Sequence, residues 1–121
     1  MNQLFVKALK SPNPSELDID EWLRESEKIF IENKVRAIFL FGSMAKKKSE
    51  EGSDIDLFII AETEIDFIER PINYLSILEN KYEINILVYT PEEFRELTRK
   101  PTFGFWQDVV SSMKLIYGTW Q

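Results

Sequence analysis

The hydrophobic and polar positions of this chain form three mostly apolar segments, which are separated by segments with helical periodicity. The segments 35–41 and 54–61 contain nearly continuous apolar runs, which are typical of buried strands. The segment 83–89 alternates isoleucine and valine with other residues, as expected for a strand with one face on a core. The pattern therefore predicts three strands, and the segment 114–117 at the end of the chain predicts a short edge strand.

The segments between these strands predict helices. Their expected ranges are 18–33, 43–48, 65–81, 90–99 and 105–112. The fourth helix has the clearest start signal, because Thr90 suits the N-cap, Pro91 the first turn and Glu93 the last position of a capping box. Pro71 lies inside the third segment, where it either opens a second helix or kinks the first.

The order of these elements predicts an α/β (α+β) fold. We expect a small mixed β-sheet of three to four strands with helices packed on one face, the other face being partly open for a site. A chain of 121 residues without repeats or long linkers is expected to form one domain over 1–121. Its core is expected over about 17–118, and residues 1–14 could form an N-terminal arm.

The composition excludes several kinds of chemistry. The chain has no cysteine and no histidine, so disulfides, thiol catalysis, serine–histidine sites and the usual structural zinc sites are excluded. The net charge of −6 argues against nucleic acid as a general ligand. No apolar run reaches the length of a membrane span, and no signal-peptide pattern opens the chain, so we expect a cytoplasmic protein without membrane contact.

The strongest candidate for chemistry is a pair of short motifs between the first two predicted strands. Gly42 and Ser43 end the first strand, and Asp54 and Asp56 begin the second after a spacer of ten residues. Residues i and i+2 of a strand share a face, so the two carboxylates are expected about 7 Å apart. Such a pair repels unless a cation lies between the carboxylates, and a Gly-Ser turn offers N–H groups to phosphate. The motifs therefore predict a site for a metal-bound nucleoside triphosphate.

This spacing of Gly-Ser and Asp-x-Asp resembles the signature of the polymerase-β-like nucleotidyltransferase superfamily, and the short length resembles its minimal nucleotidyltransferase (MNT) branch. The resemblance implies the nucleotidyltransferase fold, with Gly42 and Ser43 binding the nucleotide. It also implies that Asp54 and Asp56 act in catalysis and bind Mg²⁺ or Mn²⁺. The implied reaction transfers NMP from an NTP, taken to be ATP, to an acceptor and releases pyrophosphate. The implied partner is a HEPN-domain toxin, with this chain as the antitoxin.

Two positions depart from the family pattern. Asn85 stands in the third strand where a third catalytic carboxylate is expected, and an amide cannot act as a base. Glu83, two residues earlier on the same face, is a candidate substitute, although a solvated strand end is the simpler interpretation. Lys46 stands where family members typically have an arginine and a glycine, and it could supply the positive charge for the triphosphate.

These departures leave three hypotheses. The first is an active minimal nucleotidyltransferase. The second is a degenerate member that binds nucleotide or a partner without transfer, which Asn85 favours. The third is a structural adaptor with a fortuitous motif. Most C-terminal aromatic residues are expected in the core, whereas Trp120, next to the last residue, suggests a contact with a second copy or another protein.

Overall fold

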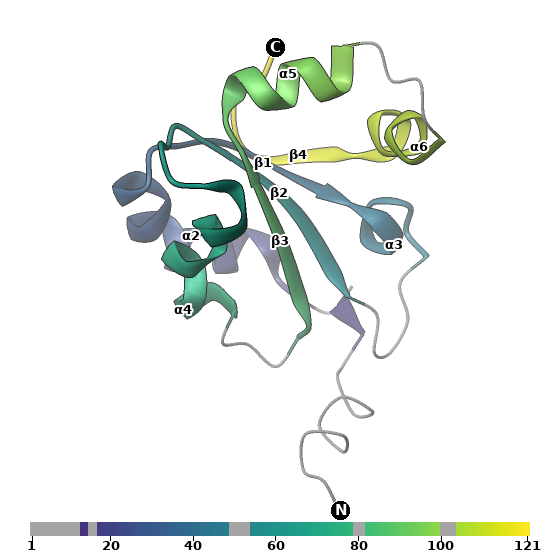
Figure 1. The fold of residues 1–121 in the computed structure, drawn as a ribbon. Helices are drawn as coiled ribbons and strands as arrows, with labels where there is room; N and C mark the ends of the chain where they lie inside the picture. Colours follow the sequence, from purple (N-terminus) through teal and green to yellow (C-terminus); the bar gives the residue numbers. More distant parts are fainter. Residues whose placement is uncertain (1–12, 15–16, 49–53, 79–81, 100–103) are drawn as a thin grey trace, which may run out of the picture.

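A mixed four-stranded sheet lies at the centre of the computed structural model, which describes residues 13–14, 17–48, 54–78, 82–99 and 104–121 (Figure 1). The strands stand in the order β3-β2-β1-β4. They are β1 (Val35–Phe41), β2 (Ile55–Ala61), β3 (Ile84–Tyr89) and β4 (Lys114–Gly118). β1 is antiparallel to both β2 and β4, whereas β2 and β3 are parallel. The predicted mixed sheet and the edge position of the last strand are confirmed.

Helical segments connect these strands close to where the sequence predicts them. They are α2 (Ile19–Glu32), α3 (Gly42–Ala45), η2 (Phe67–Tyr74), α4 (Leu75–Leu78), α5 (Pro91–Arg99) and α6 (Gly104–Ser112). The Asp18 side chain caps α2 by accepting a hydrogen bond from the Glu21 N–H at 3.1 Å. The capping box of α5 is confirmed, because the Glu93 N–H donates to Thr90 Oγ1 at 3.2 Å and the Thr90 N–H donates to Glu93 Oε1 at 2.8 Å.

The segment predicted as a helix over 65–81 differs from the prediction. It forms the 3₁₀ helix η2 followed by one turn of α-helix, α4. Pro71 lies inside η2. Its missing N–H and its ring disfavour a continuous α-helix, and the residue before a proline avoids the α region. The last residues of the predicted segment, 79–81, lie outside the described residues.

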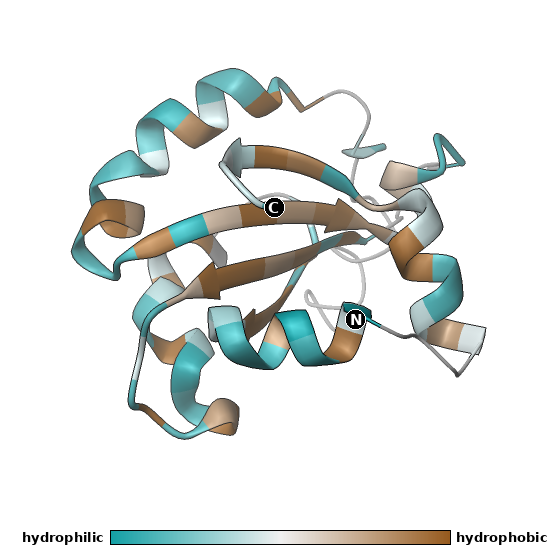
Figure 2. Cartoon of the chain, turned by 90° about the horizontal axis from the view of Figure 1, so that it is seen from above, coloured by the Kyte–Doolittle hydropathy of each residue, from teal (hydrophilic) through white to brown (hydrophobic). Residues whose placement is uncertain are grey.

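One face of the sheet packs against α2, η2 and α4. The buried side chains of this cluster include Trp22, Phe30, Tyr74, Ile77, Ile38, Leu57 and Ile59. In Figure 2 the strands are largely apolar, whereas the outer surfaces of the helices carry hydrophilic residues. This arrangement is the expected one for helices on a sheet face, and it buries the alternate residues of each strand.

The second face is also partly covered by helices, which corrects the expectation that helices pack on one face only. Phe94 of α5 and Val109 of α6 pack on Phe39, Phe41 and Phe58. The rings of Phe41 and Phe58 stack with centroids 3.9 Å apart. Because β1 and β2 are apolar on both faces, the second face also needs a cover, and α5 and α6 supply it.

Trp120 belongs to this second cluster. Its ring lies 5.4 Å from that of Phe94 and 6.3 Å from that of Phe39, and the Arg95 guanidinium lies 5.0 Å from its centroid. Trp120 therefore packs within the chain and stays half-buried. Its predicted contact with a second copy or another protein stays a prediction. The predicted arm lies outside the described residues except for 13–14, and so do the loop 49–53 and Phe103. In the part of the chain that is described, no helix is long and apolar enough to cross a membrane.

Candidate nucleotide and metal site

A glycine turn brings the end of β1 against the start of β2. Gly42 has φ +74°, a conformation that L side chains rarely adopt, and a Cβ at this position would overlap Oδ2 of Asp56. The strand register explains the closeness, because Phe41 pairs with Asp56 across β1 and β2. Gly42 therefore leaves room for the Asp56 carboxylate, which a side chain at position 42 would displace.

The second part of the site is a carboxylate pair joined by an amide. Asp54 directly precedes β2, Asp56 is the second residue of β2, and the parallel register places Asn85 of β3 beside Asp56. The Asn85 side-chain Nδ2 donates to Asp54 Oδ2 and to Asp56 Oδ1, each at 3.1 Å. The structure thus brings together the two predicted metal ligands and the residue at the third-carboxylate position.

The electrostatics of this pair favour a cation. Burial raises the pKa of the Asp56 carboxyl, the hydrogen bond from Asn85 lowers it, and the charge of Asp54 raises it further. The net direction is upward, so ionised Asp56 is destabilised by its surroundings. Carboxylate oxygens are the ligands that Mg²⁺ and Mn²⁺ prefer, so the donor set fits a hard divalent cation.

Glu83 does not join the aspartates as a third acidic ligand. Its side chain is exposed at the residue before β3, and its carbonyl accepts a hydrogen bond from the Ile55 N–H at 2.7 Å. Among the described residues, no group of three acidic, histidine or cysteine side chains could hold a metal ion. A catalytic role for Glu83 as the substitute carboxylate stays a prediction, without a supporting contact in the structure.

Ser43 and Lys46, the other two residues that the sequence assigned to the nucleotide, follow the Gly42 turn. Ser43 is half-buried in α3, directly after Gly42. Lys46 follows α3, and its Nζ forms an ion pair with Asp108 of α6 at 2.6 Å. The cation that the sequence assigned to the triphosphate is therefore paired with a carboxylate 62 residues further along the chain. Asp108 is the neighbour that sequence reasoning missed, because no local pattern links it to Lys46.

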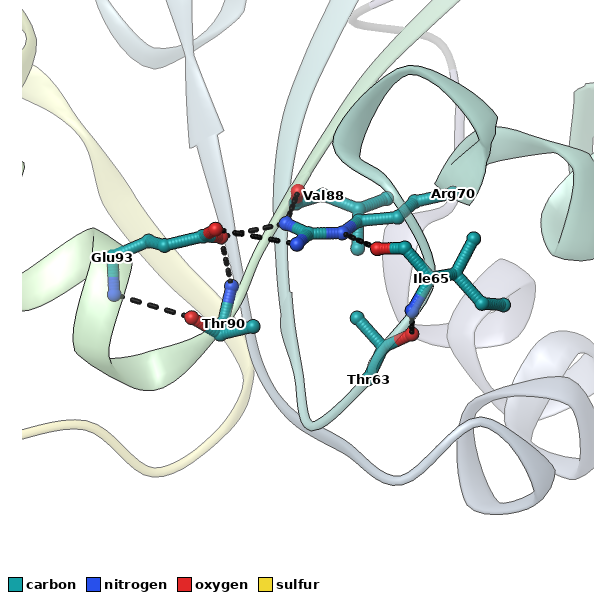
Figure 3. A network of polar contacts seen from close by, with 6 residues as sticks. All are labelled: Thr63, Ile65, Arg70, Val88, Thr90 and Glu93. Carbon is teal, nitrogen blue, oxygen red and sulfur yellow. Dashed lines mark hydrogen bonds and ion pairs between the residues drawn. The ribbon is translucent and has the colours of Figure 1, made fainter.

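A second polar cluster, which the sequence did not predict, lies at the opposite end of β2 and β3 (Figure 3). Arg70 of η2 is 7% exposed and donates to the carbonyls of Ile65 and Val88 at 2.8 and 3.0 Å. Its guanidinium also donates to both carboxylate oxygens of Glu93, at 2.6 and 3.2 Å. These hydrogen bonds from Arg70, with a smaller contribution from Thr90, lower the pKa of the Glu93 carboxyl.

This Arg70–Glu93 cluster borders an open pocket of about 700 Å³. The pocket is lined by Arg70, Thr90 and Tyr74 among others, and by none of Gly42, Asp54, Asp56 and Asn85. Each nitrogen of the Arg70 guanidinium has a protein acceptor, so the cluster joins η2 to β3 and α5. We interpret the Arg70–Glu93 cluster as structural. The candidate site lies at the end of the sheet that carries Asp54 and Asp56, which we call the aspartate end.

Comparisons with known proteins identify the family of the chain. The model of the family "Polymerase beta, Nucleotidyltransferase" matches residues 24–120, and the chain belongs to this family of nucleotidyltransferases. Among curated proteins, it is 36% identical over 67 residues to a probable protein adenylyltransferase MntA from Haemophilus influenzae. That match spans 52% of this chain and 59% of the relative, so the chain covers less than two thirds of the relative's length.

Solved structures show the same fold. A chain in a crystal structure of a toxin–antitoxin with AMP-PNP matches at a TM-score of 0.56 and 23% identity, over 85% of this chain and 75% of the other. A chain in a structure of a tri-AMPylated Shewanella oneidensis HEPN toxin in complex with an MNT antitoxin matches at 0.50 and 21% identity, over 84% and 73%. The predicted nucleotidyltransferase fold is confirmed, and the resemblance stated from the motif holds at the level of the family.

Proposed function

We propose that this protein is a Mg²⁺-dependent nucleotidyltransferase that transfers AMP from ATP to a hydroxyl group on a HEPN-domain toxin and acts as the antitoxin. The observation that carries the proposal is the position of the Asp54–Asp56 pair beside the Gly42 turn at one edge of the sheet. The similarity to the probable protein adenylyltransferase MntA supports the choice of AMP as the transferred group.

Each residue of the site has a separate role in this proposal. Asp54 and Asp56 would hold the divalent cation, which neutralises charge on the triphosphate when bound. Gly42 allows the backbone to approach a phosphate closely, and Ser43 adds a hydroxyl next to it. In the transfer, the acceptor oxygen bonds to the α-phosphorus while the bond to the α,β-bridging oxygen breaks. Pyrophosphate leaves, and the proton of the acceptor hydroxyl passes to a carboxylate of the site or to water.

The partner is proposed from the structural neighbours. In this proposal a second protein presents its acceptor hydroxyl to the end of the sheet that carries Asp54 and Asp56. Toxin–antitoxin complexes are found among the structural neighbours, which makes a HEPN toxin the first partner to test.

A second candidate function is nucleotide or partner binding without transfer. Asn85 favours it, because an uncharged amide occupies the third-carboxylate position and donates to both aspartates. An amide cannot accept a proton from the acceptor hydroxyl, so the transfer would lose its base at this position. The substitution Asn85→Asp separates the two functions, because activity that appears only in this variant indicates a degenerate enzyme.

The direct test uses ATP labelled at the α-phosphate, Mg²⁺, the purified chain and a purified HEPN-domain protein as the acceptor. The proposal predicts label on the HEPN protein with the unaltered chain and no label with Asp54→Asn/Asp56→Asn. Label at the γ-position should not transfer, because pyrophosphate carries it away. Equal α-labelling by the unaltered chain and by the double variant would overturn the proposal. No labelling by the unaltered chain, together with labelling by Asn85→Asp, would establish the second candidate.

A further inference from the structure

The Asn85 amide group lies between the two carboxylates of the site. Both of its hydrogen bonds, to Asp54 Oδ2 and to Asp56 Oδ1, are 3.1 Å long. An amide nitrogen has two hydrogens, so one group can serve both carboxylates at once. Without such a donor, two carboxylates within reach of the same amide nitrogen repel, and that repulsion is largest when no cation is bound.

We infer that Asn85 takes the place of a cation between Asp54 and Asp56, so that the pair costs less stability without metal and the divalent cation enters together with its nucleotide. The amide has partial positive charge on its hydrogens and directs them at the oxygens that a cation would bind. A free cation must displace these two hydrogen bonds and gains only two charged ligands in return. A cation that arrives on a triphosphate brings further oxygen ligands, which offset that loss.

This inference rests on the proposed function for the identity of the cation and its nucleotide. It goes beyond that function because it assigns Asn85 a positioning role in the cation-free protein. It also explains the departure from the family pattern without assuming that the site is inactive. A third carboxylate at position 85 would instead create a group of three like charges that needs a cation to be stable.

The test compares thermal unfolding of the unaltered chain and of Asn85→Asp in EDTA, without nucleotide. We expect Asn85→Asp to unfold about 5 °C lower in EDTA, because it replaces two hydrogen bonds by like-charge repulsion. Mn²⁺ alone should then raise the unfolding temperature of Asn85→Asp and leave that of the unaltered chain nearly unchanged. Titration with Mn²⁺ should give at least about tenfold tighter binding to Asn85→Asp, because ligand charge sets the affinity for hard cations.

A charge-matched variant, Asp54→Asn/Asn85→Asp, separates charge from packing. It keeps one amide and two carboxylates at positions 54, 56 and 85, but the amide moves from position 85 to position 54. We expect it to recover most of the unfolding temperature in EDTA and to lose the response to Mn²⁺ alone. Glu25→Gln is the surface control, because Glu25 is an exposed carboxylate of α2 that lies outside the candidate site. That variant should match the unaltered chain.

Three results would overturn the inference. The first is an equal unfolding temperature for the unaltered chain and Asn85→Asp in EDTA. The second is a rise with Mn²⁺ alone that is as large in the unaltered chain as in Asn85→Asp. The third is a charge-matched variant that stays as unstable as Asn85→Asp. Because none of these measurements uses ATP or an acceptor, they remain decisive for Asn85 even when no transfer activity is found.

Discussion

The two ends of the sheet use buried and half-buried charge in opposite ways. At one end, Arg70 and Glu93 form a bidentate pair, and the pKa of the Glu93 carboxyl is lowered. At the other end, Asp54 and Asp56 share only a neutral amide, and the pKa of Asp56 is raised. A charge with a partner in the chain stabilises the fold. A charge without an ionic partner costs stability, and that cost is recovered when a ligand supplies the missing charge.

The largest expected effect concerns the end of the sheet that carries the Arg70–Glu93 ion pair, which we call the paired end. Arg70→Met should lower the free energy of unfolding by about 3 kcal/mol, because it leaves two carbonyls without their donor and Glu93 without its cation. Denaturant unfolding measures this change. Arg36→Met is the matched control, because Arg36 forms an exposed ion pair with Glu62 at 3.4 Å, and such pairs contribute less than about 1 kcal/mol. Equal losses in the two variants would show that Arg70 is not a structural anchor.

The aspartate end is tested next by its glycine. Gly42→Ala should lower the free energy of unfolding by about 2 kcal/mol, because φ is +74° and the new Cβ would displace the Asp56 carboxylate. The same variant should lose any stabilisation by ATP with Mg²⁺, whereas Arg70→Met should keep it. Gly104→Ala is the control, because a Cβ there meets nothing within 4 Å. A Gly42→Ala variant with normal stability and normal response to nucleotide would contradict the assigned geometry.

A smaller effect on the free energy of unfolding is expected at Thr90, which caps the first turn of α5. Thr90→Ala should lower the free energy of unfolding by about 1 kcal/mol, because it removes the hydroxyl that caps the Glu93 N–H. Thr90→Ser keeps that hydroxyl and should restore most of the loss. Chemical denaturation of the three proteins measures the difference. A serine variant as unstable as the alanine variant would show that the methyl group, and not the cap, is responsible.

The smallest expected effect is on the pH dependence of the free energy of unfolding, to which Glu93 and Asp56 contribute with opposite signs. The pKa of Glu93 is lowered in the fold from its ordinary value of 4.5, so its stabilisation is present above that pH and is lost as the pH falls through the folded pKa. The pKa of Asp56 is raised, so protonation as the pH falls from neutral relieves an unfavourable charge. Each contribution is expected below about 1 kcal/mol at these partly exposed sites.

Unfolding free energies measured across the acid range, for Glu93→Gln and Asp56→Asn against the unaltered chain, check these signs. Relative to Glu93→Gln, the unaltered chain should lose stability as the pH falls. Relative to Asp56→Asn, it should gain. Parallel curves for all three proteins would mean that the two ends do not differ in the way described.

The sequence predicted that Asp54 and Asp56 lie close to the Gly42 turn, and it did not predict the Arg70–Glu93 pair. The spacing of Gly42, Asp54 and Asp56 is local, so two strands and one turn suffice to bring these residues together. The Arg70–Glu93 pair joins residues 23 apart on η2 and α5, and no periodic pattern marks it. The covering of the second sheet face by α5 and α6 was missed for the same reason, since it depends on how distant segments fold back. The 3₁₀ geometry of η2 could be suspected from Pro71 but not assigned.

The most direct test of the account is thermal unfolding with ATP, with and without Mg²⁺, for the unaltered chain and for Asp54→Asn/Asp56→Asn. At a hundred times its dissociation constant, the nucleotide should stabilise the unaltered chain by about 2.7 kcal/mol, which is a rise of several degrees. The account predicts that this rise requires Mg²⁺ and disappears in the double variant. An equal rise in both proteins, or no rise in the unaltered chain, would contradict a metal-bound nucleotide site at the aspartate end.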